Sequence, residues 1–156
     1  SGKKLRYHDP ELNESYVPYV VETSIGLDRM FLAVMTYAYT EEDLGEGNSR
    51  VVMKLPPVLA PYKVAVFPLT KKDGLAEKAH EIMNGLKMDH MCFYEEKDSI
   101  GKRYRRHDAI GTPYCITVDH QTLEDETVTM RERDSMKQER VHINEISDIV
   151  SKRIRG

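Results

Sequence analysis

Residues 63–118 read KVAVFPLTKKDGLAEKAHEIMNGLKMDHMCFYEEKDSIGKRYRRHDAIGTPYCITV, and this stretch decides the fold. Three short apolar runs predict buried strands, and helical patterns separate them. A C-terminal cap glycine, Gly111, follows the second helical pattern. Strands that alternate with helices favour parallel pairing. We expect the strands at 63–69, 91–94 and 114–118 and the helices at 75–88 and 99–109.

The residues that follow predict a hairpin and a final helix. Alternation at 127–133 places Val128 and Met130 on one side of a strand, and 138–142 alternates again after a turn. The last helix is expected from about Asn144, a residue type suited to an N-cap. The expected fold class is therefore α/β, with a mixed five-stranded sheet and three helices.

The residues before the deciding stretch form a different block. A β-rich segment at 16–23 leads to Gly26 and to a helix at 27–39, which is apolar on nearly every face beyond Asp28 and Arg29. Such a helix is normally buried in a larger protein, and this one is too short to cross a membrane. We expect a further part of the protein upstream. We also predict that the chain self-associates or folds this helix onto its second block.

A seam separates the two blocks. The acidic segment 40–49, TEEDLGEGNS, contains glycine and has no periodicity, so it predicts a loop. Pro56, Pro57 and Pro61 then predict an extended connector, because proline blocks a helix there. We place the domain boundary between residues 49 and 50.

Composition limits the classes of function. With 40% hydrophobic and 31% charged residues the chain can build a core, and its net charge of −3 means that any nucleic-acid site must be a local patch. Cys92 and Cys115 lie in apolar contexts and predict reduced core thiols. The six histidines show no metal-ligand spacing, so we assign no metal. No signal peptide or membrane span is visible, and the expected compartment is the cytoplasm.

Glu22–Arg29 read ETSIGLDR, and with the preceding residues they resemble motif 3 of class II glycyl-tRNA synthetases. A strand, a glycine turn and a helix that opens near an arginine suit a nucleotide phosphate. The resemblance implies that Glu22 and Ser24 bind glycine. It also implies an ATP site formed by Gly26, Leu27, Asp28 and Arg29.

Three further stretches resemble the anticodon-binding domain shared by the glycyl, histidyl, threonyl and prolyl enzymes. They are LPPVLAPYKVAVFPL at 55–69, SIGKRYRRHDAIGTPYCITVD at 99–119 and TVTMRERDSMKQERV at 127–141. The resemblance covers essentially the whole chain. It implies that residues 1–49 are the C-terminal remnant of a catalytic domain and that residues 50–156 are an anticodon-binding domain.

The resemblance also implies a partner, a tRNA for glycine, tRNA(Gly). Cations on the helix at 99–109 and on the outward face of the hairpin would contact phosphates, and carboxylates would read the two cytosines of the anticodon. We expect Arg140 on that outward face, and Arg103 and His107 on one face of the helix. The alternative is a solvated helix whose arginines pair with Asp108, Glu132 and Glu139. The candidate anticodon-binding residues are Lys102, Arg103, Arg106, Glu124, Asp125, Arg131 and Arg133.

The chain lacks class II motifs 1 and 2, so no catalytic set is complete in it. The parent enzyme would use ATP with Mg2+ to join glycine to its tRNA through glycyl-adenylate, as a homodimer and without a membrane. We expect the fragment to be inactive alone and to hold no cofactor. Two alternatives stay open. One is a stand-alone binding module, and the other is a small α/β enzyme, for which no nucleophile–base pair or phosphate loop stands out.

Overall fold

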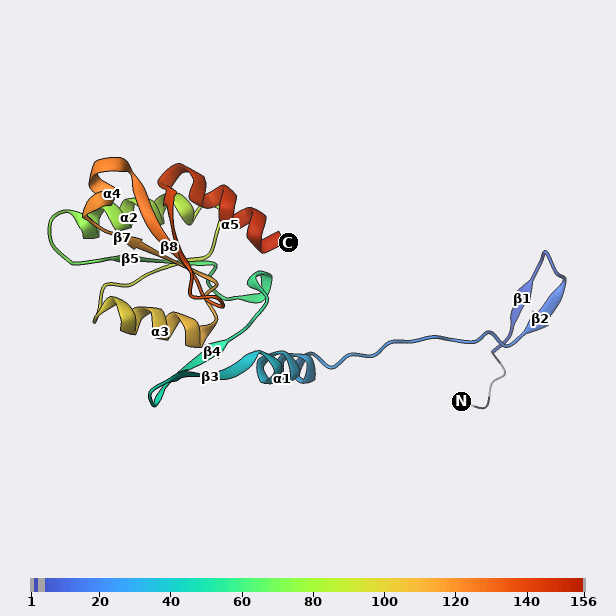
Figure 1. Cartoon of the computed structure of the whole chain (residues 1–156). Helices are drawn as coiled ribbons and strands as arrows, with labels where there is room; N and C mark the ends of the chain where they lie inside the picture. The colour runs from blue at the N-terminus through green and yellow to red at the C-terminus, as the bar shows by residue number, and fades with distance from the viewer. Residues whose placement is uncertain (1, 3–4, 156) are drawn as a thin grey trace. The chain divides into compact units, whose positions relative to one another are not determined.

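The computed structural model describes residues 2 and 5–155, which divide into a first unit ending at Phe31 and a second unit beginning at Leu32. The second unit contains a five-stranded sheet in the order β6-β5-β7-β8-β9 (Figure 1). Its strands are β5 (Val64–Pro68), β6 (Cys92–Tyr94), β7 (Tyr114–Val118), β8 (Thr127–Glu132) and β9 (Gln138–His142). The expected α/β fold class with a mixed sheet is confirmed.

The sheet is parallel on one side and antiparallel on the other. β5 pairs in parallel with β6 and β7, and Val64 lies opposite both Cys92 and Tyr114. β8 is antiparallel to β7 and to β9. Because β5, β6 and β7 run in the same direction, the turns that follow them lie along one edge of the sheet.

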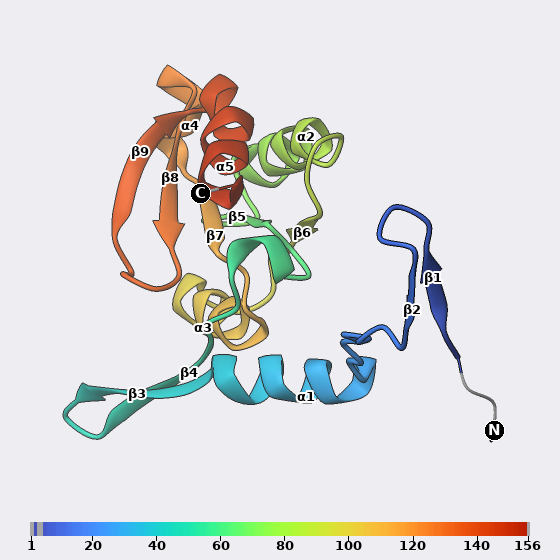
Figure 2. The same ribbon diagram turned by 90° about the vertical axis from the view of Figure 1, so that its right-hand side faces the viewer.

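Helices cover both faces of the sheet, as Figures 1 and 2 show. α2 (Leu75–Leu86) and α5 (Ile146–Arg155) pack on one face, and α3 (Ile100–Ile110) packs on the other. β5 and β7 are therefore buried along their whole length. The first core includes Val64, Val66, Leu75, Ile116, Val128, Met130, Ile146 and Val150. The second joins Ala65, Phe67 and Cys115 to Ile100 and Tyr104 of α3.

A fourth helix, α4 (His120–Asp125), is not predicted by the sequence reading. Its 6 residues are too few to show helical periodicity. Asp119 begins it with a capping box, in which its carboxylate accepts from the Thr122 amide and the Thr122 hydroxyl accepts from the Asp119 amide, both at 3.1 Å. Short 3-10 turns lie at Pro57–Leu59 and Ile143–Glu145, so α5 begins two residues later than the expected start at Asn144.

The prediction of a loop at 40–49 is wrong. The chain forms an antiparallel hairpin of β3 (Tyr39–Gly45) and β4 (Asn48–Met53), and β4 crosses the boundary expected between residues 49 and 50. Glu46 and Gly47 make the turn with positive φ angles of 52° and 76°, as a two-residue hairpin turn requires. The run of acidic residues in β3 concealed its alternation. β4 lies against α3.

The first unit contains a small hairpin of β1 (Tyr7–Asp9) and β2 (Glu14–Tyr16), in which the Tyr7 and Tyr16 rings meet edge to face with centroids 5.8 Å apart. The predicted strand at 16–23 is wrong beyond Tyr16. Residues 17–26 have no regular structure, because no neighbouring strand among the described residues supplies a hydrogen-bonding partner.

The apolar helix is present as α1 (Leu27–Ala38). Ala38 is its one buried residue, and large side chains along it, such as Phe31 and Tyr37, are exposed. An apolar surface of this kind is unfavourable in water. Self-association of the chain therefore remains a prediction.

Gly111 provides a test of the packing between α3 and the hairpin. Its φ of +87° is left-handed, and a Cβ there would lie 3.0 Å from the Met53 carbonyl oxygen. We expect Gly111→Ala to lower the free energy of unfolding by about 1–3 kcal/mol, because it adds both backbone strain and a clash. Urea unfolding followed by circular dichroism measures this change.

The matched control is Gly85→Ala in α2, where a Cβ would meet nothing within 4 Å. That change should stabilise the protein by about 0.5–1 kcal/mol, because alanine favours a helix. Equal unfolding midpoints for Gly111→Ala and the unaltered chain would contradict the described contact.

Candidate functional site

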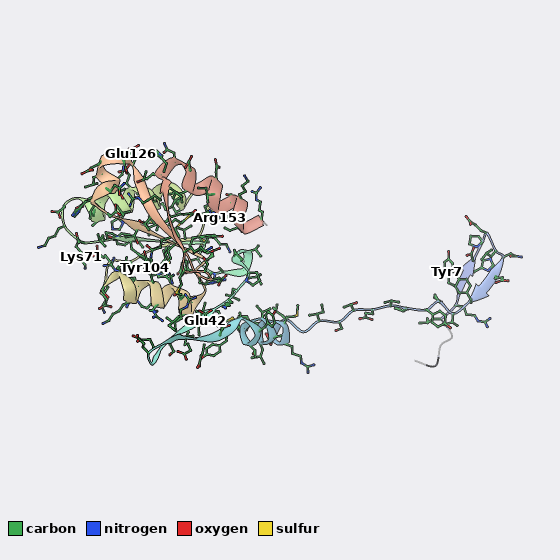
Figure 3. The ribbon with its side chains drawn as sticks, in the orientation of Figure 1. Tyr7, Glu42, Lys71, Tyr104, Glu126 and Arg153 are labelled. Atoms are coloured by element: carbon green, nitrogen blue, oxygen red, sulfur yellow. The ribbon has the colours of Figure 1, made fainter. Side chains whose placement is uncertain are left out.

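The second unit has one edge suited to binding. The turns after β5, β6 and β7 comprise residues 69–74, 95–99 and 119–120, and together with the first turn of α3 they form what we call the carboxyl edge. Lys71, in the first of these turns, lies at the left end of the unit as drawn in Figure 3. In open α/β sheets, ligands bind outside the carboxyl ends of parallel strands.

The carboxyl edge carries both signs of charge. Lys71 Nζ lies 3.1 Å from Glu96 Oε1, and the Tyr94 hydroxyl donates to Glu96 Oε2 at 2.7 Å. These bonds hold the pKa of Glu96 below its usual value, with Tyr94 contributing most. Among the described residues, the ammonium groups of Lys72 and Lys97 have no hydrogen-bond or ion-pair partner. The edge therefore offers exposed cations beside fixed carboxylates.

Two of the predicted anticodon-binding residues lie on the exposed part of α3. Lys102 is exposed in the first turn, and its ammonium makes no bond with another described residue. Arg106 is part-exposed and pairs with Glu95 Oε1 at 2.6 Å and with Asp98 Oδ2 at 2.9 Å. Arg105, on the same face, donates to the Ser49 carbonyl oxygen at 3.0 Å.

The prediction that Arg103 lies on a solvent face of α3 is wrong. Its side chain is buried, with only 3% of the residue exposed. Its guanidinium donates to the backbone carbonyl oxygens of Pro68, Glu96, Lys97 and Asp98. Arg103 thus lies behind the carboxyl edge and joins two of its turns.

The prediction of an outward hairpin face with Arg131 and Arg133 is also wrong. Thr127 and Thr129 on that side of β8 are half-buried, but both arginines are buried, and Arg131 packs against α3 with its guanidinium carbon 4.8 Å from the Tyr104 ring centroid. Arg131 forms a fork with Asp108, with Nη1–Oδ1 at 2.7 Å and Nη2–Oδ2 at 3.0 Å. The alternative of arginines paired on a solvated helix is correct only in part. Asp108 pairs with Arg131 but is buried, Glu139 pairs with Arg153, and Glu132 has no arginine partner among the described residues.

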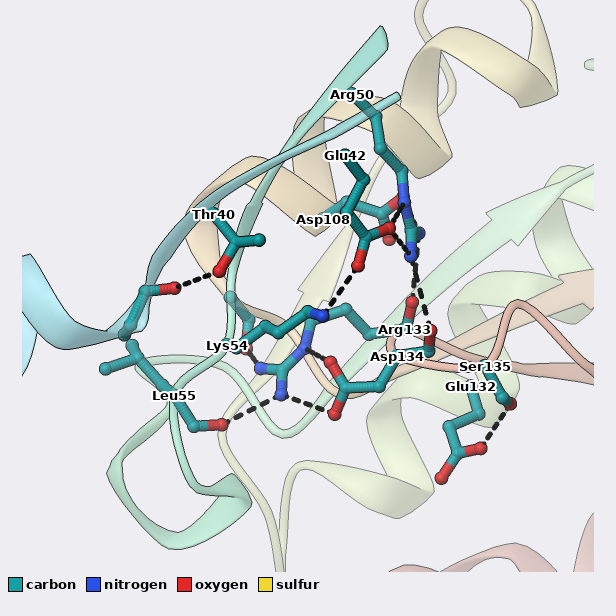
Figure 4. Close-up of polar contacts among 12 residues, drawn as sticks. Thr40, Glu42, Arg50, Lys54, Leu55, Asp108, Glu132, Arg133, Asp134 and Ser135 are labelled. Atoms are coloured by element: carbon teal, nitrogen blue, oxygen red, sulfur yellow. Dashed lines mark hydrogen bonds and ion pairs between the residues drawn. The ribbon is translucent and has the colours of Figure 1, made fainter. Parts of the chain in front are cut away.

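Arg50 of β4 completes this buried cluster (Figure 4). Its Nη1 lies 3.0 Å from Asp108 Oδ2, and it also pairs with Glu42. Arg133 donates to the carbonyl oxygens of Gly111 and Leu55 at 2.8 and 2.9 Å, and to the Asp134 carboxylate. The sequence did not reveal Arg50 as part of this cluster. Arg50 of β4 and Asp108 of α3 are distant in sequence and face each other only after folding.

Glu124 and Asp125 lie in α4, which follows β7. Asp125 accepts bonds from the Thr127 hydroxyl and amide and from Gln121, which together lower its pKa to about 2, and the Thr127 hydroxyl contributes most. Its carboxylate therefore already accepts hydrogen bonds from Thr127 and Gln121. Glu124 is exposed and makes no side-chain bond within the described part of the chain. Arg140, expected on the open hairpin face, is bonded to Asp119 and Thr127.

The residues expected to bind glycine and ATP lie in or next to the first unit. Glu22, Ser24 and Gly26 are exposed in the segment without regular structure. Leu27, Asp28 and Arg29 form the first turn of α1, as the pattern predicts. The surface pockets identified in the second unit are lined by other side chains. Their roles remain predictions.

Comparison with known proteins agrees with this architecture. The family described as an anticodon binding domain matches residues 63–153, which span the five-stranded sheet and its helices. The chain belongs to this family.

Curated relatives extend the similarity to both units. Three are named glycine–tRNA ligase. The protein from Borreliella burgdorferi is 52% identical over 97% of this chain, that from Clostridium tetani 53% over 99%, and that from Malacoplasma penetrans 56% over 94%. The chain spans about a third of their length, at 34%, 33% and 31%. The predicted resemblance to glycyl-tRNA synthetases is confirmed.

The anticodon-binding domain offers no reactive thiol. Cys115 is buried and Cys92 is half-buried, and both are free, as expected for core thiols. Burial raises the pKa of Cys92 to about 11 and raises the pKa of Cys115 as well, so both are protonated near neutral pH.

Across residues 2 and 5–155, no cluster of three or more metal-ligating side chains occurs. None of the helices described is both long and apolar enough to span a bilayer.

His107 of α3 is a buried titratable group rather than part of a basic face. Its ring lies between Phe67 and Phe93, with centroids 5.1 and 5.2 Å away, and its Nδ1 lies 3.0 Å from the Thr112 hydroxyl. Burial lowers its pKa to about 4, although Glu95 opposes this shift. His107 is therefore neutral at physiological pH.

This burial predicts a pH dependence of stability. Between about pH 6.5 and pH 4 the unfolded chain binds a proton at His107 that the folded chain excludes. The free energy of unfolding should therefore fall as pH decreases through this window, by on the order of 3 kcal/mol in all. Urea unfolding at half-unit pH steps measures the slope.

His107→Gln should flatten the slope in this window, whatever its effect on absolute stability. The control is His120→Gln, because His120 is exposed and its side chain lies 3.4 Å from Asp73. If the free energy of unfolding of His107→Gln has the same slope against pH as that of the unaltered chain, His107 is not the group responsible.

Proposed function

We propose that this chain is the anticodon-binding part of a glycine–tRNA ligase and that it binds the anticodon loop of a glycine tRNA. The observation that carries the proposal is the identity of 52–56% to proteins named glycine–tRNA ligase across nearly the whole chain. The family match to an anticodon binding domain supports the same partner.

The carboxyl edge is the surface that we propose for the anticodon. Lys72, Lys97 and Lys102 would attract the phosphates, because each is exposed and makes no hydrogen bond or ion pair through its ammonium with a described residue. A cytosine presents an amino group that can donate to a carboxylate, and Glu124, exposed in the last turn of α4 outside the carboxyl edge, is our candidate for that acceptor. Arg106 is the one predicted arginine that keeps a solvent-exposed guanidinium here.

Arg103 supports this surface from inside in our proposal, whereas Arg131 and Arg133 are bonded in other parts of the fold. Each guanidinium is bonded to carbonyl or carboxylate oxygens of the protein. Contact with RNA would require breaking buried, charge-assisted bonds, which is costly. Asp125 is likewise less suited than Glu124, because Thr127 and Gln121 already occupy its carboxylate.

The parent protein would attach glycine to its tRNA through glycyl-adenylate, in the cytoplasm and as a homodimer. Glu22 and Ser24 would hold glycine, and Gly26, Leu27, Asp28 and Arg29 would line the ATP site. Arg29 fits an anionic nucleotide because it adds a permanent cation to the amino end of α1, where backbone amides are free. Mg2+ would accompany ATP on residues outside this chain. The fragment alone would bind RNA without catalysis.

Fluorescence anisotropy with a labelled glycine-tRNA anticodon stem–loop tests the proposal. We expect salt-sensitive binding that weakens when the two anticodon cytosines are replaced, by about 1–3 kcal/mol for each base read. Binding that is indifferent to the cytosines would contradict anticodon recognition and leave only a phosphate contact.

Lys102→Ala tests the location of the site. Removing one phosphate contact should lower the slope of log affinity against log salt by about 1 and weaken binding roughly threefold. The loss should be the same for both anticodon sequences, because phosphates carry no sequence information. Lys137→Ala is the control, since Lys137 is exposed in the turn between β8 and β9, away from the carboxyl edge. An equal loss for both variants would place the site elsewhere.

A further inference from the structure

Arg103 makes an unusual set of bonds for a residue of an RNA-binding helix. Nη1 donates to the Pro68 carbonyl oxygen at 2.5 Å, at the end of β5. Nη2 donates to the carbonyl oxygens of Glu96 and Asp98 at 3.1 and 2.8 Å, in the turn after β6. Nε donates to the same Asp98 oxygen at 3.1 Å. One guanidinium therefore joins α3 to the ends of two neighbouring strands.

Arg103 and Arg106 hold the turn after β6 from opposite sides. Asp98 has a left-handed φ of +68°, a conformation that costs energy for a residue other than glycine. Arg106 holds the same turn from its outer side, through the Asp98 carboxylate at 2.9 Å and the Lys97 carbonyl oxygen at 2.9 Å. With its backbone fixed in this way, the turn presents the side chain of Lys97 to solvent beside Lys102.

A lysine could not replace Arg103 in this role. The guanidinium is planar, and its donors point in fixed directions that match carbonyl groups on three sides. An ammonium carries three donors on a flexible stem and reaches fewer of these oxygens at once. Replacing Arg103 with lysine would keep the positive charge but would lose the geometry of the turn.

We propose that Arg103 is the positioning residue of the carboxyl edge. It fixes the turn after β6, where Asp98 in turn holds the exposed guanidinium of Arg106, and by fixing Arg106 as a base reader it sets the selectivity for the anticodon bases without touching the RNA. This inference rests on the proposed function. Phosphate attraction depends on charge and tolerates small displacements, whereas base reading needs hydrogen-bond geometry. Loosening the turns should therefore cost base discrimination and spare the salt dependence.

The test compares Arg103→Lys with Arg133→Lys. Both remove a buried guanidinium bonded to backbone carbonyls and keep the positive charge, but Arg133 contacts Gly111 and Leu55, which lie outside the carboxyl edge. Affinity is measured by anisotropy for the glycine anticodon stem–loop and for the same RNA with both cytosines replaced, at several salt concentrations. All variants are measured at a temperature at which circular dichroism shows them folded.

We expect Arg103→Lys to reduce the ratio of the two affinities at least fivefold, in line with the loss of roughly one base contact. Its salt slope should stay within experimental error of the unaltered chain. Arg133→Lys should keep both the ratio and the slope. A second variant, with one glycine inserted between Lys97 and Asp98, should reproduce the loss of discrimination with Arg103 intact, and it carries the test if Arg103→Lys does not fold.

Three results would overturn the inference. The first is full discrimination by Arg103→Lys or by the glycine insertion. The second is an equal loss of discrimination in Arg133→Lys, which would indicate general loosening of the fold. The third is a lower salt slope in Arg103→Lys together with lost discrimination, which would indicate that Arg103 contacts the RNA directly. An unaltered chain that binds without discrimination would overturn the proposed function itself, together with this inference.

Discussion

The buried carboxylate of Asp108 holds the second unit together. It accepts a two-point contact from Arg131 of β8 and a further contact from Arg50 of β4, while its own residue belongs to α3. Breaking a buried ion pair by removing one partner costs about 3–5 kcal/mol, because the remaining charge is left unpaired. The hairpin β3–β4 therefore docks on α3 through charge as well as through packing. Gly111 lets this contact form, because its missing side chain leaves room for Met53.

Because several arginines pair inside the protein, few of them remain at the surface to contact a partner of this chain, whose net charge is −3. Arg50, Arg103, Arg131 and Arg133 are all buried and bonded within the protein. The cations left for a polyanionic partner are chiefly lysines, and Lys72, Lys97 and Lys102 lie at the carboxyl edge. Arginine forms rigid forks with buried oxygens, whereas lysine remains hydrated at the surface. We therefore infer that buried arginines stabilise the binding surface and that exposed lysines attract the ligand.

Sequence reasoning was most successful where periodicity alone determines structure. β7, β9 and the apolar sides of α2 and α5 followed directly from their patterns. It failed at β3, whose acidic residues resemble a loop, and at α4, which is too short to have a period. It also failed for Arg131 and Arg133, because alternation separates the two sides of a strand but does not tell whether a helix covers the polar side. That information depends on α3 packing across the sheet, a contact between residues distant in sequence.

The most direct test of the proposed division between buried arginines and exposed lysines is hydrogen–deuterium exchange of the chain with and without a glycine anticodon stem–loop. If RNA binds at the carboxyl edge, amides in residues 69–74 and 95–102 should exchange more slowly in the complex, while those in the β8–β9 turn at residues 133–137 should not change. Protection of that turn with an unchanged carboxyl edge would contradict this division. That result would place the anticodon site on the β8–β9 hairpin, near Arg131 and Arg133, as the sequence predicted.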